Sequence, residues 1–203
     1  PHSYAGTNNT LLFGNYNSWT VQEMEIYTTN VFSYASSTIL TNSTLQNAAL
    51  SLFTPSRLLF RASRDGFAAS RFHQLCDGFA PLFVVVRATT GYIATGYTVT
   101  AWNSIGGYWI TVPYNNNWLN NLWNGSSVST TKYYHDRNSQ DYAIYDAGNY
   151  GPTFGGGHDM YISDNCNTNN NSSSNAPNSY SVPNSTWLFG SQNFTVSDYE
   201  VYI

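Results

Sequence analysis

The residues best suited to catalysis lie in one short stretch of the chain. Ser63, His73 and Asp77 have the side-chain types of a nucleophile, base and acid triad, and Cys76 follows His73 by three residues, which is helical spacing. However, no G-x-S-x-G or comparable motif places a nucleophile on a sharp turn. The few acidic residues show no pair suited to glycoside hydrolysis. We therefore expect that the protein is not an enzyme.

A bound cation is a second chemical possibility. Asp159 and Asp164 flank a predicted strand, and carboxylates together with nearby asparagine amides are the oxygen ligands that calcium prefers. The spacing is not that of an EF-hand, and a role in turns, or pairing with Arg61 or Arg64, explains both aspartates more simply. We expect no resident metal and no other cofactor, with calcium at these two aspartates as the weak alternative.

Two cysteines, Cys76 and Cys166, are too few and too far apart for a zinc site. An even cysteine count in a secreted chain favours a disulfide, and two buried thiols are the alternative. The composition favours the first interpretation, because it is typical of extracellular proteins. We therefore expect a Cys76–Cys166 disulfide.

N-x-S/T sequons are frequent in this chain, but the serine and threonine content alone gives about five or six by chance. The motifs therefore permit N-linked glycans without establishing them, and two adjacent sequons cannot readily both be occupied. The seven candidate asparagines are Asn8, Asn42, Asn124, Asn170, Asn171, Asn184 and Asn193.

Charge is scarce in this sequence. Charged residues make up 9% of the chain, far below the roughly 25% usual in soluble domains, while Tyr, Asn, Ser and Thr are abundant. With seven basic residues and a net charge of −4 the chain has no face for a polyanion, so we expect no nucleic-acid partner. We also expect no membrane span, and we find no signal peptide, so a secreted protein would be present here as a mature or partial chain.

The elements that position these residues follow from hydrophobic periodicity. Helices are predicted over 40–55 and 67–78, and two polar stretches, 115–132 and 166–178, are predicted to be loops. The fold class that follows is α+β and mostly β, a two-sheet antiparallel sandwich with about two short flanking helices. Short strands are predicted over 57–63, 81–88, 92–100, 107–112, 142–146 and 159–163.

Aromatic residues in the first predicted loop suggest a binding function. Trp118 and Trp123 lie among asparagines, and amphipathic rings of this kind stack on sugars at binding surfaces. Contacts that anchor the loop to the core are an equally good explanation.

Several blocks of this sequence resemble the TLDc domain family. They are LLFRASRDGFAASRFHQLCDG at 58–78, GYIATGYT at 91–98, GGYW at 106–109, AIYDAGNYGPTFGGGHDMYISDNCN at 143–167 and FTVSDYEVY at 194–202. The resemblance runs from about residue 36 to 203. It implies two antiparallel sheets packed together with helices at the side, and a family without an established catalytic mechanism. Intracellular members are linked to oxidative-stress resistance and to the vacuolar proton pump.

The end of the chain is repeated at its start. Residues 1–27 and 177–202 align at 13 identities over 26 positions when Ser18 is skipped. In the family, the stretch that resembles 177–203 closes the domain, so we divide the chain into an arm, residues 1–30, and a TLDc-like body, residues 31–203. The arm then looks like the closing strand of another body. Its candidate assembly residues are Leu11, Leu12, Phe13, Trp19, Val21, Met24 and Ile26.

Three interpretations of the arm remain open. It lies on a neighbouring copy by strand exchange or β-augmentation, it is the tail of a preceding repeat of 176 residues, or it extends its own sheet. The first two predict an extracellular structural subunit that joins copies of itself head to tail in a linear polymer or fibril. The alternative function is a secreted carbohydrate- or protein-binding module that does not polymerise.

Overall fold

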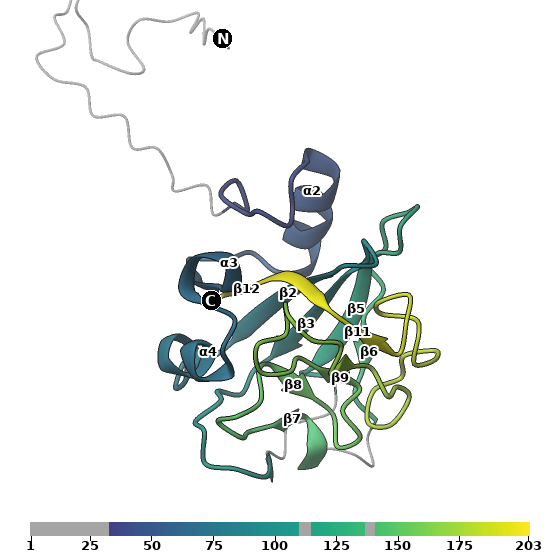
Figure 1. The fold of residues 1–203 in the computed structure, drawn as a ribbon. Coiled ribbons are helices and arrows are strands. Elements are labelled where there is room, and N and C mark those ends of the chain that lie inside the picture. Colours follow the sequence, from purple (N-terminus) through teal and green to yellow (C-terminus); the bar gives the residue numbers. More distant parts are fainter. Residues whose placement is uncertain (1–32, 110–114, 137–140) are drawn as a thin grey trace, which may run out of the picture. The chain divides into compact units, whose positions relative to one another are not determined.

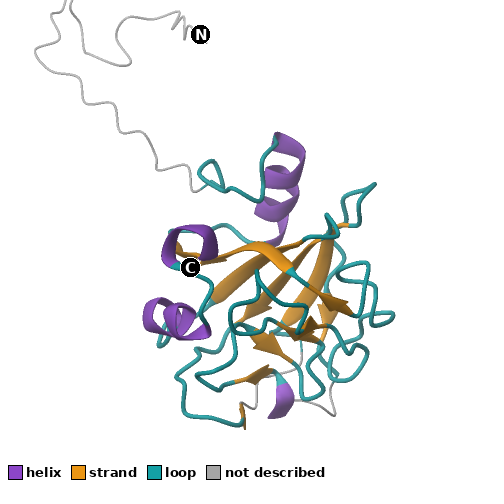
Figure 2. Cartoon of the chain, viewed as in Figure 1, coloured by secondary structure: helices purple, strands orange, loops and turns teal. Residues whose placement is uncertain are grey.

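The computed structural model of this chain describes residues 33–109, 115–136 and 141–203. Within them, the strands form two antiparallel sheets, and three short helices lie against the first sheet (Figure 1, Figure 2). The expected fold class, mostly β with two sheets and short flanking helices, is confirmed. The N-terminal arm lies outside the described residues. No helix within the described residues is long and apolar enough to cross a bilayer.

The first sheet is built around the last strand of the chain. β12 is hydrogen-bonded to β1 on one side and to β2 on the other, so the C-terminal strand lies inside the sheet rather than at its edge. In spatial order the strands are β1 (Leu58–Arg61), β12 (Val196–Tyr202), β2 (Leu82–Ala88), β3 (Ile93–Thr98), β5 (Trp118–Trp123) and β6 (Tyr133–Tyr134).

The second sheet consists of strands of two residues each, joined by long turns. Short strands of this kind expose little unpaired backbone at their edges. In spatial order they are β11 (Asn193–Phe194), β10 (Ser172–Ser173), β9 (Met160–Tyr161), β8 (Thr153–Phe154), β7 (Ile144–Tyr145) and β4 (Tyr108–Trp109).

The first sheet is covered on both faces, which explains the apolar run of β2. Val84 and Val86 pack into the core shared with the second sheet, whereas Phe83 and Val85 belong to a second core beneath helix α2 (Ser43–Leu52). Successive residues of a strand face opposite sides, so a strand buried on both faces must be apolar throughout. The sheets approach closely at Gly96 on β3, where a Cβ atom would lie 2.7 Å from the Phe154 ring.

Helix α2 forms as its sequence predicts. The Asn42 side chain accepts a hydrogen bond from the Leu45 amide at 3.0 Å, which caps the N-terminus, and Leu45, Ala49 and Leu52 bury one face. The second expected helix is α4 (Ala69–Cys76). A third, α3 (Ala62–Asp65), begins within the strand that the sequence predicted over 57–63.

Two predicted loops contain strands, so those predictions were wrong. The stretch 115–132 contains β5, which pairs along its length with β3. A polar residue such as Asn120 can be buried in this strand because its side-chain amide donates hydrogen bonds to the carbonyls of Ser129 and Thr131, at 3.0 and 2.9 Å. The stretch 166–178 contains β10, which is buried. The Ser172 hydroxyl there accepts from the Ser163 amide, which makes the polar strand acceptable in the interior.

Candidate functional site

The closing segment, residues 177–203, is the region that the arm repeats, and its buried acids hold it in place. Glu200 on β12 is fully buried and accepts hydrogen bonds from Arg61 Nε at 2.8 Å, the Thr38 amide at 2.9 Å, the Ser37 hydroxyl at 2.5 Å and the Tyr202 hydroxyl at 2.7 Å. A buried charge is costly unless paired and fully bonded. Glu200 therefore fits only a slot that supplies these donors.

A second acid on the same face of β12 joins the strand to two other segments. Asp198 accepts from the Ser63 amide at 3.0 Å and the Ser63 hydroxyl at 2.7 Å, and from the Thr38 hydroxyl at 2.8 Å. Ser63 belongs to α3, and Thr38 lies in the segment before α2. The two acids thus connect the closing strand to the first half of the body. Next to them, burial raises the pKa values of Tyr34 and Tyr202.

The opposite face of the closing segment is apolar and lies in the core between the sheets. The Phe189 and Phe194 rings stack with centroids 3.9 Å apart. A register shift between Val196 and Asp198 brings Val196 to the same core as Tyr199 and Val201. Both faces of β12, the strand of the closing segment, therefore lie in the interior.

The assembly residues expected in the arm lie outside the described residues, but the repeat assigns each of them a described counterpart. Six of the seven counterparts are at most 1% exposed, and the exception, Trp187, is 42% exposed. In arm order the counterparts are Trp187, Leu188, Phe189, Phe194, Val196, Tyr199 and Val201.

The residues considered for a catalytic triad have other partners. The Ser63 hydroxyl bonds Asp198, as described above, whereas His73 Nδ1 lies 2.7 Å from Asp77 and its Nε2 lies 2.8 Å from the Tyr150 carbonyl. The structure does not assemble Ser63 with His73. That the protein is not an enzyme stays a prediction.

The expected disulfide between Cys76 and Cys166 is wrong. Both cysteines lie within the described residues, both are free and fully buried, and they are not at disulfide distance from each other. They reach the core from different elements, Cys76 from the last turn of α4 and Cys166 from the turn after β9. Burial raises the pKa of the Tyr199 hydroxyl, and interactions with Cys166 and Cys76 raise it further. Burial raises the pKa of the Cys166 thiol to about 12 and raises that of Cys76 as well.

The two aspartates considered for calcium accept hydrogen bonds from separate backbone segments. Asp159 is fully buried and takes the amides of Asn178, Ser179 and Tyr180; burial raises its pKa, and these bonds oppose the rise. Asp164 takes the Ala69 amide at the start of α4 at 2.7 Å. Among the described residues, no group of three or more His, Cys, Asp and Glu is arranged to hold a metal.

The sequon asparagines that the structure describes are all exposed, and Asn8 lies outside the described residues. Two of them form tight turns with their own sequons: Asn124 Oδ1 accepts from the Ser126 amide and hydroxyl, and Asn184 Oδ1 accepts from the Thr186 amide and hydroxyl. Glycosylation stays a prediction. The exposed positions are Asn42, Asn124, Asn170, Asn171, Asn184 and Asn193.

The tryptophans predicted as sugar platforms are core residues. Trp118 is 3% exposed and stacks on Tyr97, and Trp123 is partly buried against the same core. Among the tryptophans whose side chains the structure describes, Trp187 is the exposed one, and the sequence analysis did not select it. A signal was present, because the repeat preserves the Leu-Phe-Gly that follows Trp187 but has Leu11 in its place.

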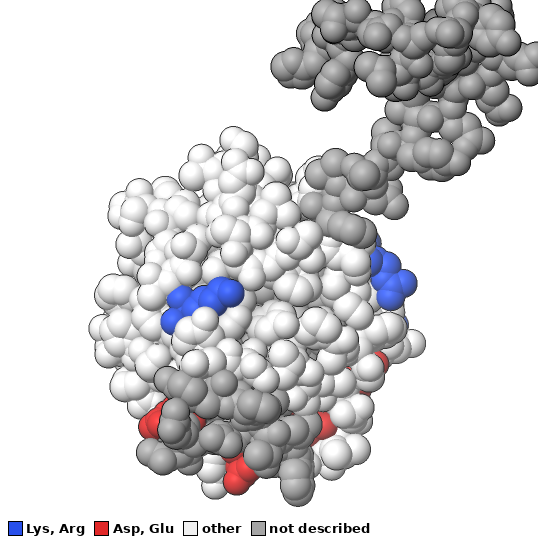
Figure 3. Space-filling view, turned by 180° about the vertical axis from the view of Figure 1, so that it is seen from behind, with Lys and Arg blue, Asp and Glu red and all other residues white. Residues whose placement is uncertain are grey.

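The surface carries little charge. Figure 3 shows isolated basic and acidic residues on one face of the molecule that is otherwise uncharged. This agrees with a composition rich in asparagine, serine and threonine.

The fold and the buried closing strand define a mostly β domain of two antiparallel sheets, in which the last strand completes the first sheet. Residues 30–203 match the TLDc domain, so the chain belongs to the TLDc domain family. No curated protein matches the chain.

Proposed function

We propose that this chain is a structural subunit of a linear extracellular array, in which the arm acts as the closing segment of a TLDc body other than its own. The observation that supports this most is the burial of the closing segment. The arm repeats a sequence whose counterpart is committed to the interior on both faces.

The arm preserves the acidic face of β12. Glu25 is the counterpart of Glu200, and Glu23 is the counterpart of Asp198. The carboxylate of Glu200 is stabilised by Arg61 and its neighbours inside the sheet. A strand lying along an outer edge of a sheet would not meet these donors, so the fold would not require a carboxylate at this position. The repeated acids therefore support insertion into a slot with the same donors.

The arm also preserves the apolar face and the alternation between the two faces. Met24 and Ile26 are the counterparts of Tyr199 and Val201, which pack between the sheets. Burial of each such side chain contributes about 1.5–3 kcal/mol, which must offset the entropy of ordering the strand. A slot that is already formed keeps that cost low.

The slot in the chain's own body is filled, because β12 is hydrogen-bonded to β1 and to β2. The body that the arm closes is therefore that of a neighbouring copy that has released its β12, or that of a preceding repeat. Both arrangements join one unit to the next by unlike surfaces, and such contacts extend into a line unless the rotation closes a ring. The charge-poor surface supports an extracellular location, and the exposed sequons are compatible with it.

Light scattering after size-exclusion chromatography tests exchange between copies. Residues 1–203 should form species whose mass rises with concentration, and residues 31–203 should be monomeric. Glu25→Lys should abolish assembly, because its counterpart is buried, whereas Gln22→Lys should not, because its counterpart Ser197 is exposed.

A monomeric chain of residues 1–203 would exclude exchange between copies. The proposal would then require that the arm closes a TLDc body that precedes it in the same chain, as in a tandem repeat. Failure of that fusion to fold would overturn the proposal in both forms.

A further inference from the structure

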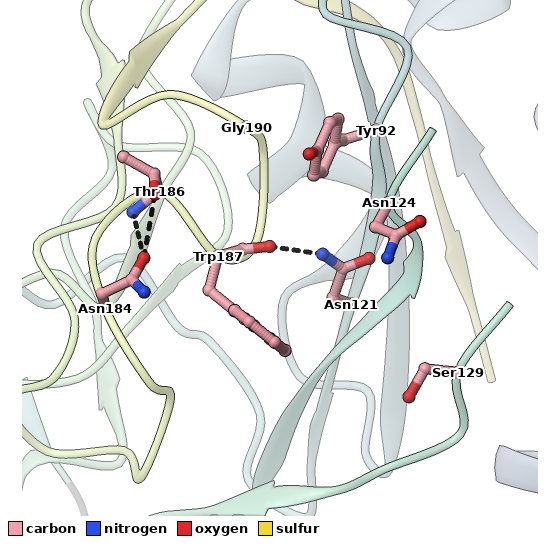
Figure 4. A pocket seen from close by; sticks show the side chains of 8 residues that line it. All are labelled: Tyr92, Asn121, Asn124, Ser129, Asn184, Thr186, Trp187 and Gly190. Atoms are coloured by element: carbon pink, nitrogen blue, oxygen red, sulfur yellow. Dashed lines mark hydrogen bonds between the residues drawn. The ribbon is translucent and has the colours of Figure 1, made fainter. Parts of the chain in front are cut away.

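A pocket of about 340 Å³ lies between the first sheet and the turns of the closing segment (Figure 4). Its walls come from the end of β5 and the turn after it, from the turn before β3, and from residues 184–190. The volume lies within the range of small-molecule sites, roughly 300–1,000 Å³. All eight residues that line it are uncharged, so a charged ligand would find no opposite charge on its walls.

One wall of the pocket is a fixed aromatic ring. Trp187 is 42% exposed, its indole nitrogen donates to the Tyr133 hydroxyl at 2.8 Å, and the two rings meet edge to face. Tyr92 lies on another side, and it packs so closely on Gly190 that a Cβ atom there would lie 2.7 Å from its ring. The apolar lining is therefore preformed.

The floor of the pocket carries an acceptor without a donor. Asn121 on β5 is 5% exposed, and its amide nitrogen donates to the Trp187 carbonyl. Its Oδ1 atom has no hydrogen-bond partner among the described residues. In Figure 4 this oxygen points away from Trp187, toward the side of the pocket where Tyr92 and Asn124 lie. A buried carbonyl of this kind is satisfied by a ligand hydroxyl or amide.

We infer that this pocket binds a neutral saccharide unit. The apolar face of a pyranose ring stacks on Trp187, and one of its hydroxyl or acetamido groups donates to Asn121 Oδ1. The neutral amide and hydroxyl groups of Asn124 and Ser129 suit the remaining hydroxyls of such a ligand. The same chemistry has two sources, a free saccharide or an N-linked glycan attached at Asn124 or Asn184 on the rim.

Titration of bacterially produced protein, which carries no N-glycan, tests the inference with three probes: maltose, cellobiose and N,N′-diacetylchitobiose. At least one should bind at millimolar concentration by calorimetry and should shift the side-chain amide resonances of Asn121. Trp187→Ala should weaken that binding about tenfold, because it removes the stacking ring. The matched control is Tyr142→Ala, an exposed aromatic residue that does not line the pocket.

Absence of binding by all three probes, or equal binding by Trp187→Ala, would overturn the inference. The source is distinguished by producing the same chain in a host that attaches N-glycans. An attached glycan that fills the pocket would abolish binding of the free probe, whereas a site for free saccharides would keep it.

Discussion

The arm and the closing segment are two versions of one sequence, and they differ at the surface. Where the closing segment is buried, the arm keeps the residue or its chemical type: Phe13 for Phe189 and Glu25 for Glu200. At exposed positions the arm is less uniform: it has Leu11 for Trp187 and Gln22 for Ser197, but it keeps Asn184, Thr186 and Gly190 as Asn8, Thr10 and Gly14. The repeat has kept what completes the fold, and of the four pocket residues that the closing segment supplies it has replaced only the aromatic one, Trp187.

This difference separates two roles that overlap in the closing segment. Its strand completes the first sheet, and its turn at 184–190 supplies the Trp187 wall of the pocket. The arm has the sequence for the first role but lacks the aromatic wall of the second. Substitutions made at matching positions of the two copies therefore test which role each position serves.

The largest expected effect on the free energy of unfolding comes from a substitution in the core. Phe189→Ala should lower the free energy of unfolding of residues 1–203 by about 3–5 kcal/mol, because it leaves a cavity beside Phe194. Phe13→Ala should change it by less than about 0.5 kcal/mol at concentrations at which the chain is monomeric, because the body is then closed by its own β12. Urea denaturation measures both. Equal losses in the monomeric chain would mean that the arm packs into its own body, the third interpretation.

The next effect concerns the buried acid. Glu200→Ala should cost about 3 kcal/mol, because Arg61, Ser37 and Tyr202 lose their common acceptor while Arg61 keeps some contact with solvent. Glu25→Ala should leave the unfolding of the monomeric chain unchanged by the same urea measurement. A loss below about 1 kcal/mol for Glu200→Ala would show that the acid does not fix the closing strand.

A smaller effect concerns local opening of the closing strand. The Cys166 carbonyl accepts from the Val196 amide at the start of β12, so the buried thiol reports departure of that strand. Asp198→Asn should weaken the bonds to Ser63 by about 1.4 kcal/mol and speed thiol labelling of Cys166 about tenfold. The arm variant Glu23→Gln is the matched control. Labelling that is fast in the unaltered protein would contradict the burial of Cys166.

The smallest effect on stability is expected at Trp187. Trp187→Leu gives the closing segment the residue of the arm and should change the free energy of unfolding by less than about 0.5 kcal/mol, because the ring is exposed. The same variant should weaken saccharide binding about tenfold, because it removes the stacking ring. A large loss of stability would mean that Trp187 is a core residue after all.

Elements whose partners are local in the sequence could be predicted from it. Helix α2 follows from the cap at Asn42 and the spacing of its apolar residues, and β2 follows from its continuous apolar run. β5 could not be predicted, because Asn120 and Asn121 are acceptable in a buried strand only through carbonyls that the fold brings to them, that of Trp187 being 66 residues away. The pocket depends on the same long-range contact.

The disulfide prediction failed for a related reason. Cysteine count and composition indicate an oxidising compartment at best, whereas a disulfide needs two thiols at bonding distance. Cys76 and Cys166 enter the core from elements that the sequence alone does not place.

One measurement tests the central claim most directly. A chimera in which residues 31–176 are followed by residues 1–30 has the arm in place of the closing segment. The account predicts a folded monomer that unfolds cooperatively in urea, and predicts that Glu25→Lys abolishes its folding while Gln22→Lys does not. A chimera without a cooperative transition, or one whose stability is the same with either substitution, would contradict the account.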